Sequence, residues 1–214
     1  MRHFLLLLII MVGVSAQGQL VNVIGDSYVK NHKRPVEESW HCLAAKELGL
    51  TYENYGRNGG CVAWDRSTEG FGPSLLVRYK ELNPAADIVL IIAGHNDADK
   101  VKANADSLAA FTAAAGLLID FIRLQCPHAK VGWVTPWDVP REGFEQVNRA
   151  IRKVCKKKRV AVLNTAQKDA VIRVRDAEFR KKYFQGANDF AHLNAEGHRL
   201  FLPTGEAFLR KLMP

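Results

Sequence analysis

Short apolar segments alternate with longer amphipathic segments along most of the chain. Five of the apolar segments have the length of strands: 20–24, 51–55, 87–93, 130–135 and 160–163. The third contains Ile88-Val89-Leu90-Ile91-Ile92, which is apolar at every position. A strand that is apolar on both faces is typical of the middle of a parallel sheet, because helices cover both faces of such a sheet.

The segments between these strands are predicted to be mostly helical, at 36–48, 74–82, 103–124, 144–157, 166–182 and 196–212. Strands separated by helices imply right-handed βαβ units and a parallel sheet. We therefore predict one three-layer α/β/α domain of flavodoxin-like type, over residues 17–214, with about five parallel strands. In such a sheet, functional sites lie beyond the carboxyl ends of the strands.

The N-terminus has a different pattern. Met1-Arg2-His3 gives a basic start, an unbroken apolar run fills 4–12, and small residues end at Ala16. This order is typical of a secretory signal peptide over 1–16, with a mature start near Gln17. The alternative is a buried first helix or an uncleaved anchor. We expect an exported protein, periplasmic or secreted, without stable membrane insertion after cleavage, and no later apolar stretch long enough to cross a bilayer.

The net charge of the chain bears on which kinds of partner it could bind. The chain has 30 Lys and Arg against 22 Asp and Glu, a formal charge of +8. Much of the excess lies in 156–159 and among the basic residues of 173–182. No DNA-binding motif or interleaved aromatic pattern accompanies these charges, so we expect no nucleic-acid partner. We interpret them as a solvated basic face that favours anionic glycans or membrane surfaces.

The four cysteines carry no metal signature. Cys42, Cys61, Cys126 and Cys155 lie far apart, without the spacing of a zinc site. In an exported protein, four cysteines are compatible with one or two disulfides, and buried free thiols are the alternative. The sequence predicts neither a metal nor a cofactor.

Two polar groups at strand ends suggest nucleophilic catalysis. Ser27 follows the first predicted strand in a tight turn, and a serine hydroxyl becomes a good nucleophile only when a base removes its proton. His192 has the residue type of that base, and Asp189 lies three positions earlier, where it can orient the imidazole. Taken alone, each is equally compatible with a turn or a helix cap.

Two further loops offer donors for a developing oxyanion. The glycine-rich segment 54–60 follows the second strand, and glycine allows the close backbone approach that a donated N–H requires. The residues Gly56, Gly59 and Gly60 leave the register of the donor open. Asn96 follows the central strand, and its side-chain amide can donate to the same oxygen.

Taken together and in this order, the four segments resemble the SGNH hydrolases, also called GDSL esterases and lipases. The matching residues are Gly25-Asp26-Ser27, the loop glycine Gly59, Gly94-His95-Asn96-Asp97, and Asp189 with His192. The resemblance covers nearly the whole chain after the predicted signal peptide.

The resemblance implies a role for each matching position. Ser27 would be the nucleophile and His192 its base, with Asp189 as the partner of the base. The Ser27 N–H, the Gly59 N–H and the Asn96 side chain would form the oxyanion hole. The reaction would be acyl transfer to Ser27, loss of the alcohol, and hydrolysis of the acyl-enzyme by water.

The substrate is less clearly indicated. Trp137 and Asp138 follow the fourth strand directly, and with His95 they are the predicted substrate-binding residues. An aromatic ring and polar groups at that place suit a sugar ring, although Trp137 is equally expected to pack inside the protein. No large apolar lid is visible. We therefore expect deacylation, above all deacetylation, of a carbohydrate, so that the partner is a small-molecule or glycan ester.

Three alternatives remain at this stage. The chain could be a lysophospholipase or thioesterase of the same family. It could be a non-catalytic glycan-binding module with a hydrolase fold, although such members should lack the Ser, Asn or His present here. Metal-dependent hydrolysis would use His95, Asp97, Asp189 and His192, which lack a recognisable metal spacing.

Overall fold

The computed structural model describes residues 18–102 and 104–213, so the predicted signal peptide at 1–16 lies outside the described residues. Five parallel strands form one sheet in the order β2-β1-β3-β4-β5. Their bounds are β1 Leu20–Gly25, β2 Thr51–Gly56, β3 Ile88–Ile92, β4 Lys130–Val134 and β5 Ala161–Leu163. This is the flavodoxin-like order, and the predicted fold class is confirmed.

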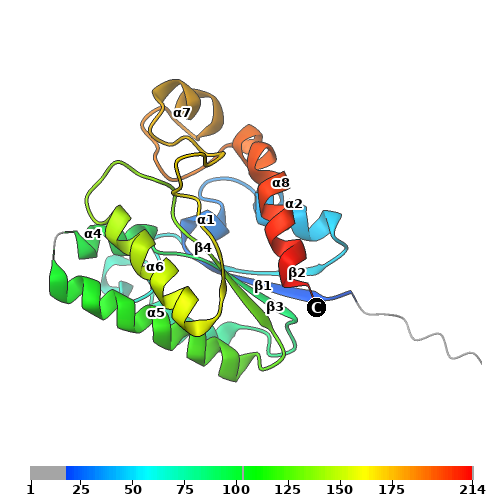
Figure 1. The fold of residues 1–214 in the computed structure, drawn as a ribbon. Coiled ribbons are helices and arrows are strands. Elements are labelled where there is room, and N and C mark those ends of the chain that lie inside the picture. Colours follow the sequence, from blue (N-terminus) through cyan, green and yellow to red (C-terminus); the bar gives the residue numbers. More distant parts are fainter. Residues whose placement is uncertain (1–17, 103, 214) are drawn as a thin grey trace, which may run out of the picture.

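Helices cover both faces of the sheet (Figure 1). The α-helices are α1 Ser27–Lys30, α2 Trp40–Glu47, α3 Leu75–Arg78, α4 His95–Val101, α5 Ala105–Gln125, α6 Phe144–Lys158, α7 Ala177–Tyr183 and α8 Ala195–Leu212. Short 3-10 helices lie at Val36–Glu38, Ser67–Glu69 and Tyr79–Glu81. Helices α5 and α6 pack together on one face, and α2 and α8 pack together on the other (Figure 1).

The middle of the sheet explains where the site lies. Every residue of β3 is buried, as its apolar sequence predicts. The chain leaves β1 toward β2 and later returns to place β3 on the other side of β1, which makes the β1–β3 boundary the topological switch point. The carboxyl ends of β1, β2 and β3 meet there, because Gly25 pairs with both Gly56 and Ile92.

One predicted helix is wrong over most of its length. Of the segment 166–182, only Ala177–Tyr183 is helical, and the part before it is irregular. There Ile172 and Val174 are buried, and the Arg180 guanidinium donates hydrogen bonds to the carbonyl oxygens of Val174 (2.8 Å) and Ala187 (2.9 Å). These tertiary contacts replace the hydrogen bonds of a helix and could not be seen from local sequence.

Helix α5 also differs from the expectation that no later segment could cross a bilayer. By length and composition alone, α5 is long and apolar enough to cross a membrane. Its Phe111, Leu118 and Ile122 are fully buried in the core beneath it. A helix that packs on a core can have the same composition as a short membrane span. Because these side chains pack on the core, we interpret α5 as a helix that covers the sheet.

The four cysteines are free in the structure. Cys61, Cys126 and Cys155 are buried and Cys42 is half-buried. Of the two alternatives that the sequence left open, the structure therefore has free thiols. Burial raises the pKa of all four, to about 11 for Cys126 and about 12 for Cys155.

Candidate active site

Ser27 is the first residue of α1, directly after the carboxyl end of β1. Asp26 caps this helix, because its carboxylate accepts a hydrogen bond from the Tyr28 N–H at 2.9 Å. The backbone N–H of Ser27 therefore lies at a helix N-terminus, where a developing negative charge is favoured. Asp26 is fully buried, and burial raises its pKa to about 7.

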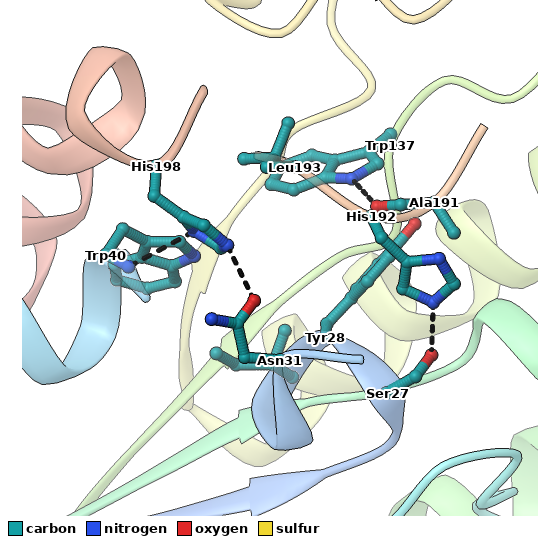
Figure 2. A pocket seen from close by; sticks show the side chains of 10 residues that line it. Ser27, Tyr28, Asn31, Trp40, Trp137, Ala191, His192, Leu193 and His198 are labelled. Atoms are coloured by element: carbon teal, nitrogen blue, oxygen red, sulfur yellow. Dashed lines mark hydrogen bonds between the residues drawn. The ribbon is translucent and has the colours of Figure 1, made fainter. Parts of the chain in front are cut away.

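His192 and Asp189 complete a hydrogen-bonded chain to this hydroxyl. His192 Nε2 lies 2.9 Å from Ser27 Oγ (Figure 2). His192 Nδ1 lies 3.0 Å from Asp189 Oδ2. The other oxygen of Asp189 accepts the N–H groups of Ala191 (2.8 Å) and His192 (2.9 Å). Burial opposes the ionisation of Asp189, but these hydrogen bonds prevail and lower its pKa. An ionised Asp189 fixes the Nδ1–H tautomer and leaves Nε2 free to accept the serine proton.

The loop that carries His192 is held from several sides. The Trp137 indole N–H donates to the Ala191 carbonyl at 2.8 Å, and the Gln185 N–H donates to the His192 carbonyl at 2.9 Å. The imidazole of His32 stacks on that of His192, with ring centroids 4.5 Å apart. These contacts place the His192 ring before any ligand binds.

The three glycines of the loop after β2 differ in what their N–H groups do. The Gly56 N–H donates to the Asn54 side chain at 2.9 Å, and the Gly60 N–H donates to the Arg57 carbonyl at 3.3 Å. Within the described ranges, the Gly59 N–H has no such partner. Of the three, Gly59 therefore has the amide that is available to an incoming oxygen, which supports the predicted register.

The Asn96 amide lies beside this loop. It donates one N–H to the Gly60 carbonyl at 2.9 Å, which orients the amide and leaves its second N–H for a ligand. Its neighbour Asp97 is fully buried and accepts the N–H groups of Val62 and Ala63 at 3.0 and 3.1 Å. Burial raises the pKa of Asp97 to about 6. Asp97 thus links the start of α4 to Val62 and Ala63, which directly follow the glycine-rich segment.

Two arginines that support this edge were not predicted as such. Arg66 donates to the Gly59 carbonyl at 2.9 Å and lies 4.3 Å from the centroid of the Phe71 ring. Arg78 is 1% exposed and donates to the carbonyls of Gly25 (3.3 Å) and Tyr55. Its position three residues after the buried Leu75 on α3 was the one available signal that Arg78 faces inward.

His192 lines two cavities among the residues that the structure describes. The first is a small space of about 10 Å³, lined by Ser27, Trp137 and Leu193 among others (Figure 2). That is about the room for one water molecule, so it holds no substrate. The second is an open hollow of about 570 Å³, lined by His32, Arg141, Asn188, Asp189, Phe190, Ala191 and His192. A ligand can reach the triad from this side.

The predicted substrate-binding residues are placed differently from expectation. Trp137 is 3% exposed and packs between Tyr28 and Phe201, so it supports the His192 loop instead of forming an open wall. His95 is buried, with both ring nitrogens in hydrogen bonds. Asp138 is paired with Arg175 at 2.5 Å and does not line the hollow. These three side chains are thus engaged within the protein and do not line the open hollow, and their contact with a substrate stays a prediction.

The alternative of metal-dependent hydrolysis needs a group of side chains that can bind an ion. In the part of the chain that the structure describes, no three His, Cys, Asp or Glu side chains form such a group. The four side chains of that alternative take part in other hydrogen bonds. His95 is hydrogen-bonded to Tyr28, Asp97 accepts two backbone N–H groups, and Asp189 and His192 are hydrogen-bonded to each other.

A doubly wound parallel sheet with a Ser–His–Asp hydrogen-bonded chain at its switch point is typical of serine hydrolases. The chain belongs to the GDSL-like lipase/acylhydrolase family, whose sequence profile matches residues 23–200. This match confirms the resemblance that the four sequence segments indicated. A search of curated proteins finds no significant match.

Solved structures show the same fold at low sequence identity. A protein from Lactobacillus plantarum is 17% identical with a TM-score of 0.75, over 92% of this chain and 99% of that one. Est24, a carbohydrate acetylesterase from Sinorhizobium meliloti, is 17% identical with a TM-score of 0.64, over 90% and 99%. A family two carbohydrate esterase from Clostridium thermocellum is 15% identical with a TM-score of 0.66, over 90% and 63%.

Proposed function

We propose that Ser27 is the nucleophile of this hydrolase, with His192 as general base and Asp189 as the group that orients it. The observation that carries the proposal is the continuous hydrogen-bonded chain, 2.9 Å from Ser27 to His192 and 3.0 Å from His192 to Asp189. His192 takes the Ser27 proton as Oγ attacks the ester carbonyl, and then gives it to the departing alcohol. Water, deprotonated by the same imidazole, hydrolyses the acyl-enzyme.

The tetrahedral oxyanion is bound by the Ser27 N–H, the Gly59 N–H and the free N–H of Asn96. The unpartnered amide of Gly59 and the oriented amide of Asn96 support this assignment. Donors fixed before the reaction need no reorganisation when the charge develops, which is why one such donor is worth about 3–4 kcal/mol of activation free energy.

The substrate that we propose is a short-chain ester, above all an acetyl ester, of a carbohydrate. Neither cavity at His192 is suited to a long acyl chain, because one is only about 10 Å³ and the other is open to solvent and carries charged side chains in its lining. Carbohydrate esterases among the proteins of the same fold support the choice. A lysophospholipase or thioesterase would need an apolar channel at this place.

We further propose that the protein is exported, on the pattern of residues 1–16 alone. Fractionation of the source cells and N-terminal sequencing test this. A protein found outside the cytoplasm with a start near Gln17 is expected. A cytoplasmic protein that keeps Met1 would contradict export and leave the esterase proposal unaffected.

The esterase proposal is tested by acetate release from acetylated oligosaccharides, compared with fatty acid release from lysolipids. We expect acetate release, and its loss by several orders of magnitude in Ser27→Ala. Ser74→Ala is the matched control, since Ser74 is a serine as buried as Ser27 (6% of the residue is exposed, against 7%) and lies outside the site. Glycan binding without turnover by the intact protein would instead support the glycan-binding module.

A further inference from the structure

The open hollow beside His192 contains one carboxylate and one guanidinium, and these two groups differ in how far they are engaged. Its titratable side chains are His32, Arg141, Asp189 and His192. The Asp189 carboxylate already accepts hydrogen bonds from the His192 ring and from two backbone N–H groups. Burial and the neighbouring His192 lower the pKa of His32, which favours the neutral form of its ring. The Asp189 carboxylate is thus the negative charge of the hollow and is engaged with the His192 loop, and the guanidinium of Arg141 is its positive charge.

Arg141 is held in place by a chain of neutral groups. Its Nη2 lies 3.1 Å from His95 Nε2, and His95 Nδ1 lies 2.8 Å from the Tyr28 hydroxyl. Burial, and then the charge of Arg141, lower the pKa of His95 to about 3. A neutral His95 accepts from the guanidinium at Nε2 and donates to Tyr28 at Nδ1. The guanidinium also lies over the Phe144 ring, 5.1 Å from its centroid.

Among the residues that the structure describes, this guanidinium has one ion-pair partner, and that pair is weak. Its ion-pair partner, Asp99, is 3.8 Å away, and both side chains are about half exposed, at 46% and 55%. Such a pair contributes roughly 0–1 kcal/mol, because water screens it. An arginine has five N–H donors, of which His95 takes one. Most of the donors therefore remain available to a ligand in the hollow.

The position of the hollow says which part of the substrate it receives. In the proposed reaction His192 Nε2 returns its proton to the departing alcohol, so the alcohol part of the ester lies on the His192 side. The hollow is lined by His192, and Asn188 and Arg141 also belong to its lining. With about 570 Å³ it has the size of an ordinary small-ligand site.

We propose that this hollow binds a carboxylate on the alcohol part of the substrate, so that the preferred substrate is an acetyl ester of an acidic sugar. The planar fork of Arg141 matches the two oxygens of a carboxylate, and its fixing by His95 reduces the entropy lost on binding. This inference rests on the proposed esterase function. It makes Arg141 the residue that distinguishes acidic from neutral sugars.

The test compares two acetyl esters that differ in one group: acetylated methyl glucoside and acetylated methyl glucuronide. We expect the wild type to prefer the glucuronide ester in kcat/KM by roughly tenfold to a hundredfold, the range of a charge-assisted hydrogen bond. In Arg141→Gln the preference should disappear, mainly through a higher KM for the glucuronide ester, because the contact is the same in the ground and transition states. Raised salt should weaken the wild-type preference.

Arg149→Gln is the matched control, because Arg149 is an exposed arginine on α6 that pairs with Glu145. It should keep the preference. Equal rates of the wild type on both esters, or a preference that survives in Arg141→Gln, would overturn the inference while the esterase proposal stands.

Calorimetry with methyl glucuronide, which carries no ester, tests the hollow independently of turnover. Binding by the wild type and by Ser27→Ala, and its loss in Arg141→Gln, is the expected result. Absence of binding to the wild type would overturn the inference. Failure of both acetyl esters to react would count against the esterase proposal instead.

Discussion

Gly59 offers the sharpest test of the oxyanion loop, because two separable effects oppose a side chain there. Its φ is +71°, in the left-handed region, and a Cβ added to it would lie 2.2 Å from the Phe71 ring. Gly70 has a similar φ of +82° but nothing within 4 Å of the same added atom. Gly59→Ala therefore introduces backbone strain and overlap, whereas Gly70→Ala introduces backbone strain alone.

The two contributions can be estimated separately. A non-glycine residue in the left-handed region costs roughly 1–2 kcal/mol of unfolding free energy. Overlap with a packed side chain adds about 1–3 kcal/mol. Phe71 is at the surface, 37% exposed, so its ring can turn aside, but then it leaves the Arg66 guanidinium that holds the Gly59 carbonyl. We expect Gly70→Ala to lose about 1–2 kcal/mol and Gly59→Ala about 2–5 kcal/mol.

Urea unfolding and the turnover of a nitrophenyl acetate measure both effects. Gly59→Ala should reduce kcat by about 10²–10³, since the N–H that faces the oxyanion moves. Gly70→Ala should keep kcat within about twofold, because surface changes away from a site have small effects. In a Phe71→Ala background the overlap is removed, so Gly59→Ala should then cost about the same stability as Gly70→Ala. Wild-type turnover by Gly59→Ala would refute the role of this amide.

Two further predictions concern buried groups. Burial raises the pKa of Asp26 from 3.8 to about 7, so the stability that its protonated form contributes is complete below pH 3.8 and is lost as pH rises to 7. The free energy of unfolding of Asp26→Asn should match that of the wild type near pH 4 and exceed it at pH 8 by up to about 4 kcal/mol, measured by thermal or urea unfolding. An equal gain in unfolding free energy at both pH values would contradict this. A thiol reagent should label only Cys42 in the native protein and all four cysteines after unfolding, whereas rapid native labelling of Cys155 would contradict the described packing.

The strands could be predicted from the sequence because their signal is local. Ile88–Ile92 is apolar at every position, and burial on both faces of a parallel sheet requires that composition. Helix α4 was not predicted, because it begins after Gly94, at φ +121°, and its His95, Asn96 and Asp97 are weak helix formers. What stabilises it is tertiary: the Asp97 carboxylate accepts the N–H groups of Val62 and Ala63, which follow the glycine-rich segment.

The candidate site likewise has residues that short motifs identify and residues that only the fold brings together. Ser27 and His192 were found because each belongs to a short motif, and the fold brings the motifs together. The chain from Tyr28 through His95 to Arg141 joins residues that are 67 and 46 positions apart, and no short motif records it. Trp137 was placed at the right end of its strand, but the sequence could not say that its ring turns inward toward Ala191.

Covalent labelling of Ser27 tests the central claim most directly. The protein is treated with a serine-directed phosphonate, and the adduct is located by mass spectrometry of peptides. We predict one adduct per chain, on Ser27, with loss of esterase activity in proportion to labelling, and neither labelling nor activity in Ser27→Ala. Full activity in a protein whose Ser27 carries the adduct, or in Ser27→Ala, would contradict the account.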